Sequence, residues 1–220
     1  MSSKLGVVTW HDDGFEYGGY FHEKTKANCD KFGHDFTTSS ERKVPDLPPH
    51  WERIPMCIEL LPKYDYLMWL DADAHLLDKD VSELTAYTTE NLLIGKDADT
   101  QEEHHHINSG VFILRNTPWS FKFLEKWIEL GPEASGKYRA HGLKVSPKKR
   151  YKFRDQGALR WMFLNNLENI NIHALVLPYG ELQHFSKPVS YVLHYAGPSG
   201  KRRLKKLYDS ENSTSNVVHQ

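Results

Sequence analysis

Short runs of apolar and β-branched residues alternate along the chain with segments in which apolar residues recur every three or four positions. The short runs are typical of buried strands, and the longer periodic segments are typical of amphipathic helices. Strands are predicted at residues 5–10, 34–38, 66–70, 91–95, 107–114, 170–177 and 189–195, and helices at 20–32, 51–61, 118–130 and 155–164, with a short basic helix or tail at 201–208. Strands that alternate with helices indicate an α/β fold with a mostly parallel central sheet.

Glycine and proline mark where these elements should end. Gly33 is predicted to stop the first helix, and the three prolines within residues 44–49 predict a loop. Asn108-Ser109-Gly110 is expected to interrupt the strand at 107–114, and residues 131–152 are expected to form a long loop. We therefore expect a single domain over residues 1–208, followed by a frayed polar tail at 209–220 that could lead into a further domain.

Composition narrows the class of protein. The chain has 220 residues, of which 39% are hydrophobic and 26% are charged, as in a globular domain. Its net charge of -1 gives no support to nucleic-acid binding. No apolar run reaches the roughly 18 residues that span a bilayer, so no membrane segment is expected. Cys29 and Cys57 lack metal-site spacing, and two cysteines in a domain of this size suggest a reducing, cytoplasmic compartment.

The stretch from Tyr66 to Asp73 carries the most chemical information. Five apolar residues predict a buried strand, and Asp71 and Asp73 follow directly at its exit. Ligands of open α/β sheets bind at the carboxyl ends of the strands. Two carboxylates this close repel each other unless a cation neutralises them, and Mg²⁺ and Mn²⁺ prefer oxygen ligands. The pair therefore favours a metal site that holds a diphosphate, although a solvated turn would have the same spacing.

At this strand exit, Asp71-Ala72-Asp73 resembles the Asp-x-Asp motif of nucleotide-sugar transferases with the GT-A fold, a Rossmann-like α/β architecture. Further segments are similar, in order and spacing, to the galactosyl- and mannosyltransferase family of plants and yeasts. These segments are Trp51-Glu52-Arg53, Leu61 to Tyr66, Ile107 to Ser120, Asp155 to Leu159, and His194-Tyr195-Ala196-Gly197. The resemblance covers about residues 50–200. Because the chain is short and shows no membrane anchor, it also resembles glycosyltransferase domains of large algal viruses, for which the compartment would be the host cytoplasm.

The resemblance implies roles for particular residues. Asp71, Asp73 and His194 would hold Mn²⁺ or Mg²⁺, whereas Asp155 and Gln156 would face the reacting carbon or the acceptor hydroxyl. The residues implied in binding a UDP-sugar donor are Thr9, Trp10, Arg53, Leu70, Asp71, Ala72, Asp73, Asn108, Ser109, Gly110, Gly197 and Lys201.

Several of these residues have a purely structural alternative. Trp10 and His194 could pack in the core. Arg53 and Lys201 could lie on solvated helix surfaces. Asp155 could serve only as the N-cap of the helix that it opens. These alternatives stay open at the level of sequence.

The sequence is thus interpreted as a metal-dependent glycosyltransferase that moves a sugar from a nucleotide-diphosphate donor, UDP-linked, to a hydroxyl of a glycan or glycoprotein. One alternative is a sugar-1-phosphate nucleotidyltransferase, but that class needs a Gly-rich loop after the first strand, where this chain has Thr9-Trp10-His11-Asp12-Asp13. Another is a non-catalytic carbohydrate-binding domain, against which the intact Asp71 and Asp73 argue. The donor sugar and the stereochemical course are not assigned.

Overall fold

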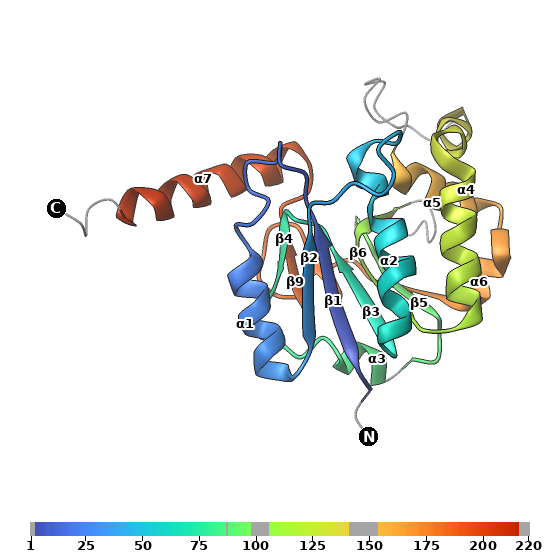
Figure 1. The fold of residues 1–220 in the computed structure, drawn as a ribbon, viewed down its shortest axis with the longest axis horizontal. Helices are drawn as coiled ribbons and strands as arrows, with labels where there is room; N and C mark the ends of the chain where they lie inside the picture. Colours follow the sequence, from blue (N-terminus) through green and yellow to red (C-terminus); the bar gives the residue numbers. More distant parts are fainter. Residues whose placement is uncertain (1–2, 87, 98–105, 141–153, 216–220) are drawn as a thin grey trace.

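The computed structural model of the chain describes residues 3–86, 88–97, 106–140 and 154–215 (Figure 1). Among these residues, six strands form the central sheet: β1 (Leu5–Trp10), β2 (Asp35–Ser39), β3 (Tyr66–Leu70), β5 (Leu92–Lys96), β6 (Ile107–Arg115) and β7 (Ala174–Leu177). They lie in the order β2-β1-β3-β6-β5-β7. The sheet is mainly parallel, as predicted, and β6 runs antiparallel to both of its neighbours.

A second, smaller sheet joins three short strands in the order β4-β9-β8. They are β4 (Ala74–Leu76), β8 (Gln183–His184) and β9 (Val192–His194). β4 begins four residues after β3 ends, and it pairs antiparallel with β9 of the small sheet. Sequence analysis missed β4 and β8, because strands of two or three residues are too short to show a hydrophobic period.

Seven α-helices and three 3₁₀ turns are found in the described part of the chain. They are α1 (His22–Phe32), η1 (Pro49–Trp51), α2 (Arg53–Leu60), η2 (Leu61–Lys63), α3 (Glu83–Ala86), α4 (Pro118–Ala140), α5 (Asp155–Leu164), η4 (Leu167–Asn169), α6 (Ile170–His173) and α7 (Gly197–Ser215). α1 lies beside the small sheet, whereas α2, α4 and α5 pack together on the other side of the central sheet (Figure 1).

The alternation of strand side chains explains why both faces of the central sheet are covered. Trp69 and Phe112 point into one core cluster, which they share with α2, α4 and α5. Met68 and Val111, their chain neighbours, point into the opposite cluster, which contains residues of α1 and the small sheet. Each such side chain contributes about 1.5–3 kcal/mol when fully buried. Strands buried on both faces therefore read as continuous apolar runs rather than alternating ones.

α7 is held to the body of the molecule by an aromatic cluster. Leu204 of α7 is buried with Tyr17, Phe21 and Tyr195. One turn of the helix further on, Tyr208 packs edge-to-face on Tyr17, with ring centroids 5.1 Å apart. The distal part of the helix projects away from the body (Figure 1). α7 extends to Ser215, beyond the predicted end at residue 208. The added residues are all polar, and Glu211 among them accepts a hydrogen bond from the Tyr20 hydroxyl and pairs with Lys24 of α1.

Other element boundaries also differ from the sequence-based predictions. Gly33 stops α1 in the left-handed conformation, as expected, with a φ of 76°. β6 is extended from Ile107 to Arg115, but its pairing with β5 is irregular at the predicted interruption. One residue lies between Ile94 and Lys96 of β5, whereas residues 108–111 lie between their partners Phe112 and Ile107. Of the two late strands, only the portions 174–177 and 192–194 are extended, because only these residues find a pairing partner.

The predicted loop at 131–152 is wrong in its first part. Gly131 has a φ of 54° and bends the chain, and a further helical segment follows from Pro132 to Ala140. Proline is tolerated in a first helical turn, so Pro132 begins this segment rather than ending the helix. The remainder of the predicted loop, residues 141–152, lies outside the described residues.

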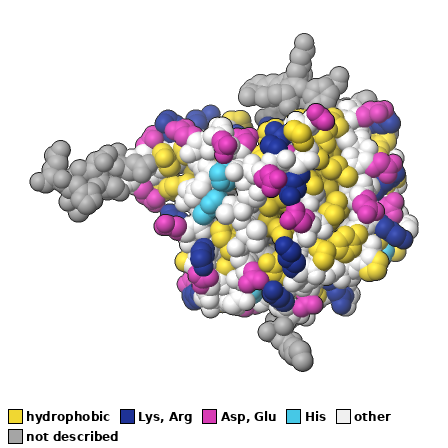
Figure 2. Space-filling view, viewed as in Figure 1, with side chains coloured by type: hydrophobic (Ala, Val, Ile, Leu, Met, Phe, Trp, Pro, Cys, Tyr) yellow, Lys and Arg dark blue, Asp and Glu magenta, His cyan; other side chains and the backbone are white. Residues whose placement is uncertain are grey.

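Surface charges of both signs are interspersed on the face seen in Figure 2. This mixture agrees with the net charge of -1 for the whole chain. None of the described helices is long and apolar enough to cross a membrane.

We predict that Gly157 permits the close crossing of α4 and α5. A Cβ at Gly157 would lie 2.0 Å from Ser135 Oγ and 3.1 Å from Ser135 Cα, so a side chain there would force the helices apart. Gly157→Ala is expected to lower the free energy of unfolding by about 1–3 kcal/mol in urea denaturation. Gly136→Ala is the matched control, because a Cβ there would meet no atom within 4 Å. Equal unfolding midpoints for both variants would contradict this packing role.

Candidate functional site

The reversed direction of β6 creates the candidate site. β6 pairs antiparallel with β3, so its first residues lie beside the turn at which β3 ends. The amide of Asp71 donates a hydrogen bond to the carbonyl of Gly110 at 2.8 Å. Asn108, Ser109 and Gly110 therefore flank the Asp71-Ala72-Asp73 turn, although they begin a strand and do not end one.

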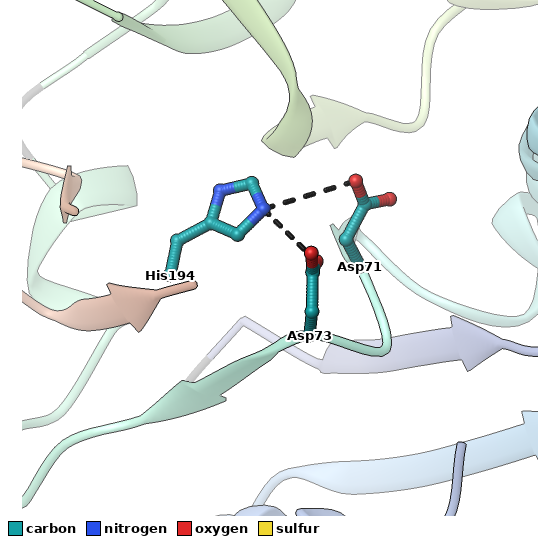
Figure 3. A group of neighbouring side chains, drawn as sticks. All are labelled: Asp71, Asp73 and His194. Carbon is teal, nitrogen blue, oxygen red and sulfur yellow. Dashed lines mark hydrogen bonds and ion pairs between the residues drawn. The ribbon is translucent and has the colours of Figure 1, made fainter. Parts of the chain in front are cut away.

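The small sheet adds His194 to this turn. Ala74 of β4 is paired with His194 of β9, and the amide of Tyr195 donates to the carbonyl of Asp73 at 2.8 Å. These pairings place a residue from near the end of the chain against a turn in its first half. Figure 3 shows the imidazole of His194 directed at both carboxylates.

Asp71, Asp73 and His194 form the one possible metal-binding cluster among the described residues. His194 Nε2 lies 3.1 Å from Asp73 Oδ1 and 3.9 Å from Asp71 Oδ2. The candidate ligand atoms all lie within 4.8 Å of one another, a spacing that one divalent cation can bridge.

Gly110 leaves the space that this cluster needs. A Cβ at Gly110 would lie 2.3 Å from His194 Cε1 and 2.7 Å from Asp71 Oδ2. Any side chain at this position would occupy the space between the imidazole and the carboxylate. The close approach of the site residues therefore requires glycine at this position.

The ionisation of the cluster reflects burial and mutual attraction. Burial raises the pKa of Asp71, and the negative charge of Asp73 adds to this rise. Burial opposes ionisation of Asp73 as well, but the neighbouring imidazole outweighs it and lowers the pKa of that carboxyl. Burial also opposes protonation of His194, yet Asp73 raises the pKa of the imidazole. A cation bound between these groups would take the place of the imidazole proton.

Arg53 is the second charged centre of the site. Its Nη2 lies 3.0 Å from Asp71 Oδ1, its Nε lies 3.2 Å from Asp155 Oδ2, and its Nη1 donates to the carbonyl of Ser109. The side chain is 5% exposed, so it is not the solvated surface arginine that the sequence allowed. Burial opposes its charge, but Asp155 and Asp71 together raise its pKa further. The guanidinium thus joins the exit of β3 to the start of α5.

Asp155 does not cap α5. Arg154 occupies the N-cap position, and no side chain caps this end of the helix. The carboxylate of Asp155 instead accepts a hydrogen bond from Ser109 Oγ at 2.9 Å and pairs with Arg53. Gln156 Oε1 accepts from the amide of Ser109 at 3.2 Å. Both residues predicted to be catalytic therefore contact β6 directly.

A cavity of about 620 Å³ opens over these residues. Ten of its lining residues were predicted site residues: Arg53, Asp71, Asp73, Asn108, Ser109, Asp155, Gln156, His194, Gly197 and Lys201. Lys201 lies in the first turns of α7 and acts on Asp73 through its charge, helping to lower the pKa of that carboxyl.

Five other predicted residues are not among the described residues that line the cavity. Gly110 is buried beside His194 and Asp71. Leu70 is buried in the core cluster with α1, and Ala72 lies within the turn between the two aspartates. Thr9 and Trp10 end β1 and are buried, and Trp10 Nε1 donates to the carbonyl of Glu41 at 2.8 Å.

Sequence analysis missed several residues of the site. Gln183 of β8 contacts His194, and Phe185 lies edge-on to the same imidazole with ring centroids 5.4 Å apart. Asp97 and Arg160 line the cavity and form an ion pair with each other. No motif marks these positions, because they reach the cavity through strand pairing and helix packing between distant segments.

Comparison with known proteins agrees with this arrangement. Residues 20–206 match the family model described as nucleotide-diphospho-sugar transferase. Xyloglucan 6-xylosyltransferase 4 of Arabidopsis thaliana is 28% identical over 167 residues, covering 69% of this chain and 32% of that protein. Probable glycosyltransferase 2 of Oryza sativa subsp. indica is 28% identical over 167 residues, covering 69% of this chain and 34% of that protein. The chain thus spans about one third of the length of these curated relatives.

Solved structures share the architecture at low sequence identity. A glycosyltransferase involved in the glycosylation of the major capsid of PBCV-1 superposes with a TM-score of 0.64 at 13% identity, covering 90% of this chain and 97% of that one. The bifunctional glycosyltransferase WbbM superposes with a TM-score of 0.56 at 13% identity, covering 90% and 46%. Together with the family match over most of its length, the shared architecture shows that this chain belongs to the nucleotide-diphospho-sugar transferases and has the GT-A fold of the glycosyltransferases.

Proposed function

We propose that this chain is a metal-dependent glycosyltransferase that moves a sugar from a UDP-sugar to a hydroxyl of a glycan or glycoprotein acceptor. The observation that carries the proposal is the convergence of Asp71, Asp73 and His194 on the wall of a cavity of about 620 Å³. That volume falls in the range of small-molecule sites.

The three residues are proposed to hold Mn²⁺ or Mg²⁺. The imidazole nitrogen favours Mn²⁺, because Mg²⁺ prefers a shell made only of oxygen atoms. The ion would neutralise negative charge on the leaving diphosphate. Gly110 supports this assignment, since the space that it leaves lies directly between two of the ligands.

The diphosphate is proposed to lie between the metal cluster and the start of α7. Lys201 supplies a positive charge there, and the N-terminal end of a helix favours anions. Gly197, with a φ of 70°, opens this helix without a side chain. Contacts from Arg53, Asn108, Ser109 and Gly110 to the donor stay predictions.

Contacts from the end of β1 to the nucleotide base also stay a prediction. Thr9 Oγ1 supports it, because this buried hydroxyl has no hydrogen-bond partner among the described residues. Backbone contacts from Leu70 and Ala72 to the donor are also proposed. Their only support is the position of these two residues at the end of β3 and in the turn that follows it.

The acceptor and the setting are part of the same proposal. The chemistry needs only a sugar or protein hydroxyl. A glycan acceptor is supported by relatives that are named xyloglucan 6-xylosyltransferase and galactomannan galactosyltransferase. A cytoplasmic setting is supported by Cys29 and Cys57, which are buried and unpaired with each other. An origin in a large virus is supported by the architecture shared with the protein that acts in PBCV-1 capsid glycosylation.

A screen of nucleotide-sugars for Mn²⁺-dependent donor hydrolysis tests the proposal as a whole. A transferase should release UDP slowly in the absence of acceptor and stop when the metal is chelated. A non-catalytic carbohydrate-binding domain would release none. The family match already favours a transferase over a sugar-1-phosphate nucleotidyltransferase.

Removal of a metal ligand is predicted to weaken metal-dependent donor binding. In Asp73→Asn, the loss of one anionic ligand should weaken Mn²⁺-dependent UDP binding by at least about tenfold in calorimetry while the fold survives. Asp78→Asn is the matched control, because Asp78 is an exposed aspartate of the same segment that pairs with Lys31. Unchanged UDP affinity in Asp73→Asn would refute the metal assignment.

Filling the space at Gly110 is predicted to separate the ligands. The added methyl group of Gly110→Ala would meet His194 and Asp71, so Mn²⁺ affinity should fall by at least about tenfold. A fluorescence or calorimetric Mn²⁺ titration measures this, and thermal melting in EDTA checks the fold. Mn²⁺ binding of wild-type strength in a folded Gly110→Ala protein would show that the cation lies elsewhere.

Asp155 and Gln156 are proposed to form the wall that faces the reacting carbon or the acceptor hydroxyl. If Asp155 acts mainly in the transition state, Asp155→Asn should lower kcat by about 100-fold and leave the Kd for UDP nearly unchanged. Steady-state kinetics measures this. A melting curve is needed beside it, because the substitution also removes a charge partner of Arg53. A normal turnover number in Asp155→Asn would contradict the catalytic role of Asp155 and would not affect the metal and donor assignments.

A further inference from the structure

Gln183 is a buried amide whose hydrogen bonding is only half satisfied. Its side chain is 1% exposed, and its Oε1 lies 2.7 Å from His194 Nδ1. Its Nε2 is buried and has no hydrogen-bond partner in the part of the chain that the structure describes. An unsatisfied buried donor is destabilising, so stability alone gives no reason for glutamine at this position.

The strand pairing aims this amide at one side of the imidazole. β8 runs parallel to β9, and Gln183 is in register with Val192, two residues before His194. Gln183 and the two aspartates therefore lie on opposite sides of the imidazole: Oε1 faces Nδ1, and Asp73 faces Nε2. Phe185 also contacts the imidazole edge-on, and this contact does not fix which nitrogen carries the proton.

We propose that Gln183 is a positioning residue that prepares His194 to bind the metal. Its Oε1 accepts the hydrogen of Nδ1, which leaves the lone pair on Nε2 directed at Asp71 and Asp73. Partners of this kind orient metal-bound histidines and set their tautomer, and their loss typically weakens metal binding about 10–100-fold. The inference rests on the proposed metal site.

Two near-isosteric substitutions separate this role from simple packing. Gln183→Met keeps the volume but cannot accept a hydrogen bond from Nδ1. Gln183→Glu keeps an oxygen that accepts from Nδ1, and the ionised carboxylate has no hydrogen to donate. If Gln183 positions His194, Mn²⁺ affinity should fall about 10–100-fold in Gln183→Met and stay within about threefold of wild type in Gln183→Glu. If Gln183 only fills space, Mn²⁺ affinity should stay near wild type in Gln183→Met and fall in Gln183→Glu, because methionine suits a buried site better than a carboxylate does.

The experiment titrates Mn²⁺ into the full chain, with free Mn²⁺ followed by electron paramagnetic resonance. Melting temperatures in EDTA show whether each variant is folded. The tautomer is measured separately by long-range ¹H–¹⁵N correlation of His194 with Mg²⁺ bound. Wild type should show a protonated Nδ1 and an unprotonated Nε2, and Gln183→Met should lose this pattern.

The outcomes are distinguishable from a failure of the proposed function. His194→Ala reports whether the imidazole binds the metal at all, and an unchanged Mn²⁺ affinity there would overturn both proposals. If His194→Ala weakens binding but a folded Gln183→Met binds Mn²⁺ as wild type does, only the role of Gln183 is overturned. If Gln183→Glu does not fold, the Gln183→Met titration and the tautomer measurement still decide.

Discussion

The repulsion between Asp71 and Asp73 is the constraint around which this site is built. Both carboxylates lie in one turn at the end of a buried strand, and this turn holds them close to each other. Positive or protonated groups balance them from two sides: Arg53 pairs with Asp71, and His194 pairs with Asp73. Arg53 is itself buried, and its charge is balanced by a second carboxylate, that of Asp155. Neutralising one acidic pair thus ties together α2, β3, β9 and α5.

Close backbone approach is the second requirement of the arrangement. Gly110 lets β6 lie against the His194 ring and the Asp71 carboxylate, and Gly157 lets α5 lie against α4. The first glycine keeps the ligand atoms within reach of one ion, and the second keeps the helix that carries Asp155 and Gln156 against the body of the domain. Both positions exclude a side chain for reasons of packing and not of backbone conformation, since neither has a positive φ.

α7 links the site to the periphery of the molecule. Lys201, which lines the cavity, is followed within one turn by Leu204, which is buried in the aromatic cluster with Tyr17, Phe21 and Tyr195. Further along, Glu211 accepts a hydrogen bond from the hydroxyl of Tyr20. The position of Lys201 at the cavity therefore depends on contacts that are made well outside it.

The sequence by itself determined the strands and helices with strong hydrophobic periodicity, the mainly parallel sheet, and the chemistry of the turn after β3. Local pattern is enough to predict these features, because a buried strand must be apolar and a turn that binds a hard divalent cation needs carboxylates. Only the tertiary structure decided which distant residues meet this turn. The reversal of β6 placed Asn108 and Gly110 beside it, and the two short strands of the small sheet placed His194 and Gln183 there. Such strands leave no period to detect, and pairing between segments more than a hundred residues apart is set by the packing of the whole core and not by any local run of residues.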